Sequence, residues 1–229
     1  MKHIIKHCVP SSLKNQDSSV NAGGSFLLKT EEDATFRGAE VNVGGNALFD
    51  VGGNMNVLAT KDYEYTYYDK QESWGGLKSE QYAKIDNVEE LAGSNVTINE
   101  GLTIVTGNNT NLVGSNLAVG GDADIYTGYK LNEDGSLEET GTGGSLNVLA
   151  DYVSETHFEE RKETNMLSDF DIDISISTDG IEASMDVGTK TRDMTEHTKT
   201  TAVGSTLTTG GSSTLNSNKI QIMSTSIAQ

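Results

Sequence analysis

The sequence has few of the residues that most globular domains use to cross-link the chain and to fill a core. Its 229 residues include one proline and one cysteine, and 6% are aromatic. A single cysteine, Cys8, excludes a disulfide within the chain. Only 34% of the residues are hydrophobic, which is little for a domain with one broad core. We therefore expect a fold with a narrow interior.

Positive charge is scarce as well. Sixteen lysines and arginines stand against 34 aspartates and glutamates, so the formal net charge is −18. Nucleic acid and anionic membrane surfaces repel such a chain, and neither is expected as a partner. No apolar run is long enough to span a bilayer or to form a signal peptide. Export is therefore expected to depend on a signal and an export domain that this chain does not contain.

Glycine, by contrast, is abundant and marks a repeated phrase. The phrase occurs as Arg37-Gly-Ala-Glu-Val-Asn-Val-Gly-Gly45, as Val113-Gly-Ser-Asn-Leu-Ala-Val-Gly-Gly121 and as Val203-Gly-Ser-Thr-Leu-Thr-Thr-Gly-Gly211. Short strands that end in Gly-Gly indicate a solenoid, in which each repeat stacks on the one before. Glycine is expected at corners where the backbone is left-handed or crowded, and stacked asparagines are expected to bond between coils.

Apolar residues recur at offsets of 19 to 21, close to one coil of a parallel β-helix. The offsets join Leu28 to Leu48, Phe36 to Met55, Ile98 to Leu117 and Ile104 to Ile125. We predict an all-β chain whose residues 20–229 form a parallel β-helix. Residues 1–19 do not fit the pattern and are predicted to be a disordered leader.

Two segments of different composition interrupt the coil blocks at 20–60, 92–150 and 202–227. Residues 61–90 hold five of the eight tyrosines and the only tryptophan, whereas 151–197 hold thirteen acids and four bases. So many acids cannot enter a coil interior. We predict that both segments project as antiparallel β-hairpins, the first with its tip near Trp74.

Strict alternation of apolar and polar residues supports the second hairpin. Apolar residues fall on even positions from Phe170 to Ile176 and on odd positions after Gly180. Pairing Ile176 with Ile181 across a turn at 177–180 places every apolar residue on one face and the acids on the other.

These phrases and interruptions resemble the haemagglutinin-repeat region of filamentous haemagglutinins, which are large exoproteins of Gram-negative bacteria. The resemblance rests on the Gly-Ser-Asn-Leu-Ala-Val-Gly-Gly phrase, on Gly-Gly-Asn-Met-Asn-Val-Leu-Ala59 and Gly-Gly-Ser-Leu-Asn-Val-Leu-Ala150, and on the Asp-Ile-Asp-Ile-Ser-Ile176 hairpin. It covers about Asn21 to Ser226. Related exoproteins include those of contact-dependent growth inhibition.

The resemblance implies a structural and interaction segment of a secreted surface protein that serves adhesion or toxin delivery. It implies two-partner secretion through an outer-membrane transporter, a receptor on a target cell or host, a role in virulence, and neighbouring repeats as further partners. No catalysis and no cofactor are expected. Two alternatives remain open: a β-helix enzyme acting on polysaccharide as a lyase, hydrolase or phage-type depolymerase, and an autotransporter passenger.

The candidate partner-binding surface combines the aromatic and acidic residues of the two hairpins, because tyrosine and tryptophan offer large contact areas with a polar end. It consists of Tyr63, Tyr65, Tyr67, Trp74, Tyr82, Asp169, Asp171 and Asp173. Alternatively, the tyrosines pack the hairpin against the coils of the β-helix. The aspartates are also the kind of paired carboxylates that a glycosidase would need. His3, His7 and Cys8 have a spacing that suits zinc on a helix, but no second ligand pair follows, so no metal site is predicted.

Overall fold

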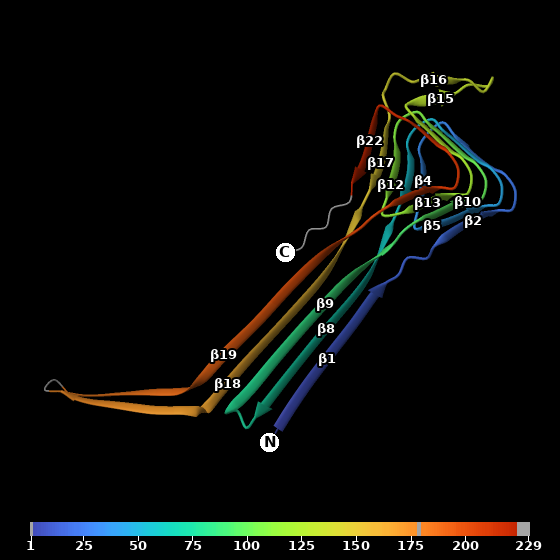
Figure 1. Ribbon diagram of the computed structural model, residues 1–229. Coiled ribbons are helices and arrows are strands. Elements are labelled where there is room, and N and C mark those ends of the chain that lie inside the picture. Colours follow the sequence, from blue (N-terminus) through green and yellow to red (C-terminus); the bar gives the residue numbers. More distant parts are fainter. Residues whose placement is uncertain (1, 178–179, 224–229) are drawn as a thin grey trace. The chain divides into compact units, whose positions relative to one another are not determined.

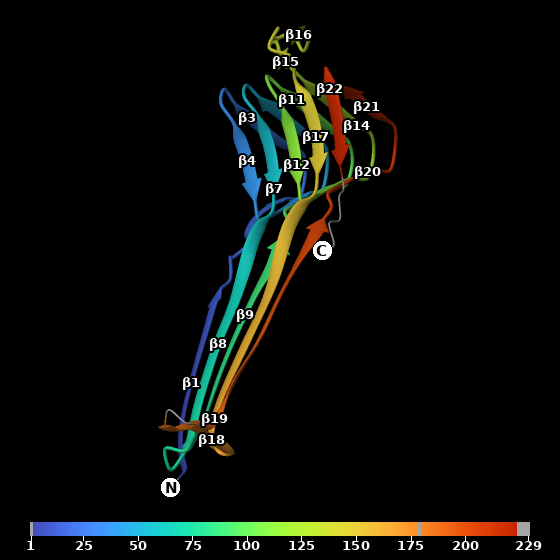
Figure 2. The same ribbon diagram turned by 90° about the vertical axis from the view of Figure 1, so that its left-hand side faces the viewer.

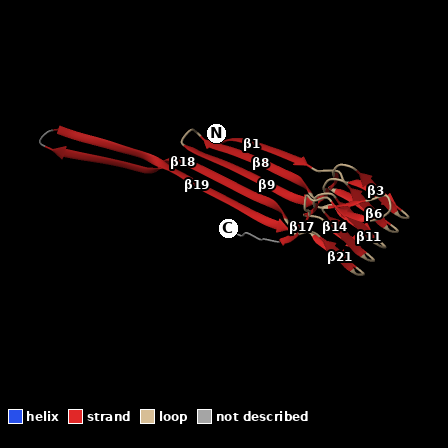
Figure 3. Ribbon diagram, turned by 90° about the horizontal axis from the view of Figure 1, so that it is seen from above, coloured by secondary structure: helices blue, strands red, loops and turns tan. Residues whose placement is uncertain are grey.

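The computed structural model describes residues 2–177 and 180–223, and it describes the side chains in these ranges except those of 167–187. The described residues form strands and no helix (Figure 3). Contacts divide the chain into two units. One, here called the arm sheet, comprises residues 1–12, 63–88 and 154–199, and the other, the parallel unit, comprises 13–62, 89–153 and 200–229.

The parallel unit contains three sheets of five strands each (Figure 2). The first sheet has β2 (Ser18–Ala22), β5 (Ala39–Val43), β10 (Asn95–Ile98), β13 (Asn116–Val119) and β20 (Thr206–Thr209). The second has β3 (Phe26–Thr30), β6 (Ala47–Val51), β11 (Leu102–Thr106), β14 (Ala123–Thr127) and β21 (Ser213–Asn216). The third has β4 (Ala34–Arg37), β7 (Met55–Leu58), β12 (Thr110–Val113), β17 (Ser145–Leu149) and β22 (Lys219–Met223).

The chain visits these three sheets in the same order five times. We call each visit a coil: β2 to β4, β5 to β7, β10 to β12, then β13, β14 and β17, and finally β20 to β22. Neighbouring strands in all three sheets are parallel. The prediction of an all-β chain with parallel sheets is confirmed, and this succession is what a parallel β-helix requires.

The register between successive coils is 21 residues wherever no segment intervenes. Ala47 lies opposite Phe26, and Asn116 lies opposite Asn95. Of the four predicted apolar pairs, only Ile104 with Ile125 is in register. The other three are wrong by one or two residues: Leu28 lies opposite Phe49, Phe36 opposite Val57 and Ile98 opposite Val119. Every second residue of a strand is apolar, so apolarity alone does not fix the register.

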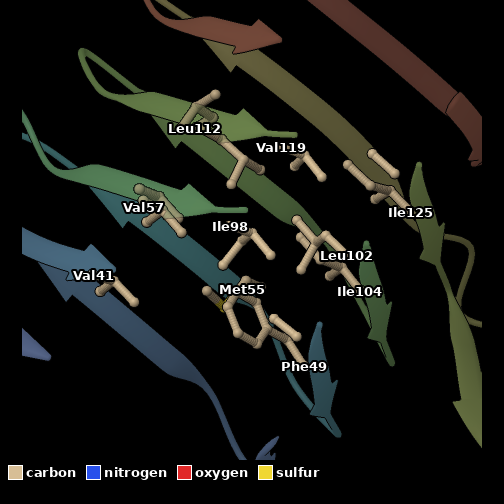
Figure 4. Packing of buried hydrophobic residues seen from close by; sticks show 14 of the residues in the cluster. Val41, Phe49, Met55, Val57, Ile98, Leu102, Ile104, Leu112, Val119 and Ile125 are labelled. Carbon is tan, nitrogen blue, oxygen red and sulfur yellow. The ribbon is translucent and has the colours of Figure 1, made fainter. Parts of the chain in front are cut away.

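The core is a narrow column of inward-facing residues inside the coils (Figure 4). Valine, isoleucine and leucine fill the middle coils, and Phe49 is fully buried in the second coil. The rings of Phe26 and Phe36 meet Phe49 edge-on, with centroids 6.1 and 6.0 Å away. Such pairs add to the free energy gained from apolar burial.

Glycine is required at several corners by crowding rather than by a left-handed backbone. At Gly107 an added Cβ would collide with the carbonyl oxygen of Gly52 in the coil below, yet the φ of Gly107 is not positive. The left-handed backbone occurs instead at the short turn after the third sheet, where Gly38 has φ 52° and Gly114 has φ 58°. The sequence prediction named both causes, and each applies at a different corner.

The serine of the Gly-Ser phrase is a buried corner residue. Ser94 Oγ accepts from the Ala39 N–H at 3.1 Å and donates to the Leu58 carbonyl at 2.7 Å. Ser115 Oγ accepts in turn from the Ser94 N–H at 3.0 Å. A hydroxyl that both donates and accepts thus satisfies two backbone groups of the neighbouring coil.

Stacked asparagines also join the coils. On the third sheet, Asn111 Nδ2 donates to Asn56 Oδ1 and Asn147 Nδ2 donates to Asn111 Oδ1, each at 2.8 Å. The Asn111 amide therefore donates to one neighbouring coil and accepts from the other, which favours alignment of the same residue type at the same position.

The arm sheet contains five strands in chain order: β1 (Lys2–Leu13), β8 (Thr60–Trp74), β9 (Lys78–Ala92), β18 (Asp151–Ser177) and β19 (Gly180–Val203). Neighbouring strands run in opposite directions (Figure 1). β8 turns into β9 at Gly75 and Gly76, where the Leu77 N–H donates to the Trp74 carbonyl at 3.1 Å. Of the turn predicted at 177–180, positions 178 and 179 lie outside the described residues.

The structure differs from the predicted leader. Residues 1–19 were expected to be disordered, but Lys2–Leu13 form β1 on the edge of the arm sheet and Ser18–Ala22 form β2. The reason is that β1 is held by backbone pairing with β8, a partner distant in sequence, and this pairing needs no apolar pattern in β1 itself. Pro10, the only proline, fits an edge strand because it lacks an N–H donor.

A third, short hairpin was not predicted. It consists of β15 (Tyr129–Leu131) and β16 (Leu137–Glu139) and lies between β14 and β17, within the predicted coil block 92–150. It covers the outer face of the second sheet, since Val105, which faces outward there, is only 1% exposed. Its turn is marked in the sequence by Asp134-Gly135, with φ 82° at Gly135.

The crowded corner gives a testable prediction. We expect Gly107→Ala to lower the free energy of unfolding by about 1–3 kcal/mol, because the coil must shift to admit the methyl group. Gly24→Ala is the matched control: no atom lies within 4 Å of its added Cβ and its φ is ordinary. We expect that control to be neutral or stabilising by up to about 1 kcal/mol. Urea unfolding followed by circular dichroism measures both, and equal effects would contradict the stacking geometry.

Candidate functional site

The two faces of the arm sheet carry different side chains, as the strand register shows. In the antiparallel pair of β9 and β18, Asp86 lies opposite His157 and Ile85 lies opposite Phe158. Because side chains alternate along a strand, even positions of β9 share a face with odd positions of β18. The even positions of β8 join the same face, since the rings of Tyr68 and Tyr82 meet at 5.9 Å.

The first face, here called the ionic face, holds a network of ion pairs. Around β9, Asp86 binds Lys84 at 2.8 Å and His157 at 2.6 Å. The Lys84 ammonium, followed by the bond from His157, holds the pKa of Asp86 below its usual value. Arg161 binds Glu80 at 3.2 Å. The pairs of Asp86 with His157 and of Glu80 with Arg161 join β9 to β18, in a sheet whose described side chains are mostly half-buried or exposed.

The tip of the first hairpin has the most buried of these charges. Glu72 is 8% exposed and binds Lys70 at 2.8 Å and Lys2 at 3.2 Å. Lys70, and then Lys2, lower the pKa of Glu72. The ammonium groups of Lys2 and Lys78 lie 5.2 and 5.3 Å from the centroid of the Trp74 ring, within the range of cation–π attraction.

The opposite face, here called the tyrosine face, has the aromatic residues at odd positions of β8. Tyr63 and Tyr65 are 39% and 37% exposed, and Tyr67 is half-buried. Ile85 and Phe158 lie on the same face as a cross-strand pair. Exposed tyrosines beside apolar residues on a flat sheet form a surface suited to contact with a partner.

The structure does not bring the predicted partner-binding residues into one surface. Tyr63, Tyr65 and Tyr67 lie on the tyrosine face, whereas Trp74 and Tyr82 lie on the ionic face, because their positions in the strands have opposite parity. Burial, and next the charge of Glu159, raise the pKa of Tyr82. Asp169, Asp171 and Asp173 belong to β18, but their side chains lie outside the described part of the chain.

Strand geometry also separates the residues considered for zinc. His7 shares a face with Asp69, 3.7 Å away, while the next residue, Cys8, points to the other face. Among the described residues, no three His, Cys, Asp or Glu side chains gather as metal ligands. Nor does any described segment form a helix long and apolar enough to cross a bilayer.

Sequence reasoning missed a groove beneath the short hairpin of β15 and β16. The groove has a volume of about 700 Å³, and the ion pair of Lys29 with Asp50, 2.8 Å long, lies in its wall. Tyr129 lines it too, and burial, together with the bond to Glu139, raises the pKa of this tyrosine. Only the turn signal at Asp134-Gly135 marks this hairpin in the sequence.

Comparison with known proteins identifies part of the chain. Residues 7–76 match the model of the hemagglutinin repeat family. Over these residues the chain is similar to the hemagglutinin repeat. The family is one of structural, adhesin-like segments of secreted or cell-surface proteins. No curated protein and no solved structure matches the chain.

The match confirms the resemblance over residues 7–76 and corrects one detail. It begins at residue 7, inside the leader that was expected to lie outside the family pattern. In the structure, the matched residues run from within β1 through two coils to the turn that follows β8. They contain part of a strand that leads into the coils, the two coils, and a strand that leads out of them.

The same arrangement follows in the rest of the chain. β9 leads into the coils β10 to β12 and β13 to β17, and β18 leads out. Gly-Gly-Asn-Met-Asn-Val-Leu-Ala59 and Gly-Gly-Ser-Leu-Asn-Val-Leu-Ala150 each precede the strand that leads out. We call β1, β9 and β19 return arms, and β8 and β18 outgoing arms.

The charge at the tip predicts a pH response. Because Glu72 has a lowered pKa in the folded chain, its ion pairs stabilise the tip above the ordinary glutamate pKa of about 4.3 and are lost as pH falls through the lower folded value. Trp74 is the only tryptophan, so its fluorescence reports on this tip. We expect a change in its emission below about pH 4.3, and Glu72→Gln should remove that step. An unchanged acid step in the variant would assign it to another carboxylate.

Proposed function

We propose that this chain is a structural and interaction segment of a large secreted surface exoprotein, serving adhesion or contact-dependent toxin delivery to neighbouring cells. The hemagglutinin repeat at 7–76 carries the proposal. The exposed tyrosine face of the arm sheet supports it, because this face presents Tyr63 and Tyr65 to a partner. Export through an outer-membrane transporter of the two-partner type, and a receptor on a target cell or host, belong to the same proposal.

The architecture proposed for this role is a right-handed parallel β-helix over residues 20–229, with the two long hairpins as its interaction elements. The fivefold succession of the three parallel sheets supports it. The coil blocks 20–60, 92–150 and 202–227 and the hairpins 61–90 and 151–197 are the functional divisions that we propose. The coils supply length and rigidity, and the hairpins supply the contact surface.

A catalytic role has less support. The hemagglutinin repeat family is structural and adhesin-like, and it is not typically enzymatic. Nothing among the described residues favours a polysaccharide-acting enzyme. We therefore propose a role in binding, without chemistry.

Excision of the first hairpin tests the role of the arms. The coil offset is 55 residues across this hairpin and 21 where no segment intervenes, so removing the 34 residues 59–92 (55 − 21 = 34) restores the plain register. Leu58-Gly93-Ser94 then replaces the hairpin with a corner like Arg37-Gly38-Ala39, because Leu58 lies opposite Arg37. We expect the β-sheet signal in circular dichroism to persist and the attachment of protein-coated beads to bacterial or host cells to be lost.

Loss of the β-sheet signal together with attachment would show that the hairpin is structural. Attachment that survives this excision, and also the equivalent removal of 150–203, would overturn recognition by the arms. A bead coated with the unchanged chain serves as the reference in both cases.

Side-chain substitutions test which face makes contact. We expect Tyr63→Ala with Tyr65→Ala to reduce bead attachment at least tenfold while the fold persists, because exposed tyrosines supply contact area without supporting a core. Tyr82→Ala, on the ionic face, is the control. Attachment lost equally in both would assign the effect to sheet stability rather than to the tyrosine face.

A further inference from the structure

The short hairpin of β15 and β16 has one edge that borders a groove. The two strands form a two-stranded sheet between β14 and β17, in the middle of the sequence, so each has one strand partner. The groove of about 700 Å³ is lined by every residue of β15 and by none of β16. Its floor consists of residues from β3, from β6 and from the corners that follow them, among them Lys29, Asp50 and Gly52.

The backbone of β15 directs donors and acceptors toward this groove. The Asn132 N–H donates to the Ser136 carbonyl at 2.9 Å, so the backbone groups of Asn132 point toward the second strand of the hairpin. Successive residues of an antiparallel strand direct their backbone groups to opposite edges. The N–H and C=O groups of Tyr129 and Leu131 therefore point away from β16, and both residues line the groove.

Hydrogen bonds at the root of the hairpin fix its position over the third coil. The hydroxyl groups of Thr140 and Thr142 both donate to the Gly107 carbonyl, at 3.0 and 3.1 Å. The Gly128 N–H donates to the Thr106 carbonyl at 2.8 Å. The groove is therefore preformed, and a partner that enters it does not have to order the hairpin first.

The charges around the groove determine what kind of partner fits it. Asp50 binds Lys29 at 2.8 Å and raises the pKa of this lysine, and Glu133 and Glu31 add to the effect. Carboxylates from β6, from a corner and from the hairpin therefore already stabilise one ammonium group there. The hairpin residues 129–140 contain four acids and one base. A basic partner is complementary to these walls, whereas an acidic one would bring like charges together.

We propose that the groove binds a basic, extended peptide segment of a partner protein, which adds as a third strand to the outer edge of β15. Main-chain hydrogen bonds to Tyr129 and Leu131 supply the affinity, and Glu31 and Glu133 select lysine or arginine. The outer edge of β16 carries backbone groups of the same kind, but it does not border the groove. A strand added there would lack the second wall.

This site is separate from the adhesive role proposed above. The groove belongs to the parallel unit, whereas the tyrosine face belongs to the arm sheet. Peptide binding and bead attachment therefore test the two proposals independently.

A fluorescein-labelled peptide of alternating lysine and valine tests the proposal, with the full chain as receptor. We expect fluorescence anisotropy to show saturable binding that weakens as salt is added. A peptide of alternating glutamate and valine is the charge control and should not bind. N-methylation tests the ladder, because alternate amides of the peptide face β15. Methylating either all lysine or all valine amides should abolish binding, and methylating the other set should leave it intact.

Hydrogen exchange followed by NMR identifies the edge that is used. We expect the bound peptide to slow exchange about tenfold at the amides of Tyr129 and Leu131. The amides of Leu137 and Glu139 face the outer edge of β16, because these residues lie opposite Leu131 and Tyr129, and their exchange should not change.

Matched substitutions in the hairpin complete the test. We expect Glu133→Gln, in the groove wall, to weaken peptide binding about threefold, and Glu138→Gln, on β16, to leave it unchanged. Both side chains are exposed, so neither change should unfold the hairpin. The absence of saturable binding, slowed exchange at Leu137 and Glu139, equal effects of the two substitutions, or equal tolerance of both N-methylated peptides would each overturn the proposal.

Discussion

The constraint on which the structure depends is the stacking of one coil on the next in a constant register. Parallel strands must lie about 4.8 Å apart with their backbone groups paired, so every position of a coil faces the same position of its neighbour. A register of 21 residues keeps apolar residues inward and asparagines in line. The same register decides which corners require glycine, because a side chain there would collide with a backbone carbonyl of the coil below.

Extra sequence is tolerated only where it leaves that register intact. The two long hairpins leave from the third sheet and return to the first, and the short hairpin of β15 and β16 leaves between the second and third. All three replace corners. None interrupts a strand, because a residue inserted there would turn every following side chain to the other face. The hairpins are thus added between coils without changing the interior of the coils.

The sequence alone predicts the parallel sheets, but it does not predict the full arrangement of residues on the surface. Gly-Gly pairs and two-residue alternation predict short parallel strands, because these signals are local. The register was missed at Leu28 because Leu48 and Phe49 are adjacent and both apolar, and only backbone pairing selects Phe49. β1 was missed for a related reason, since its partner β8 is distant in sequence.

The tyrosines show the same limit in the candidate site. Composition gathers Tyr63, Tyr65 and Tyr82 into one group, but parity within each strand places Tyr82 on the ionic face. The serine of the Gly-Ser phrase is an instructive contrast. The phrase was found as a motif, yet the role of Ser94 as donor and acceptor between coils is visible only when the coils are stacked.

The pairing of arms has a consequence for how such a gene lengthens. Each repeat adds two strands to the arm sheet and two coils to the parallel sheets, so both grow by equal numbers. A tandem duplication with endpoints in hairpin tips, such as Gly75-Gly76, copies complete arms and complete coils together. Recombination at these glycine codons would change the length of the protein in steps that each preserve every strand pair, whereas crossing over within a coil would not.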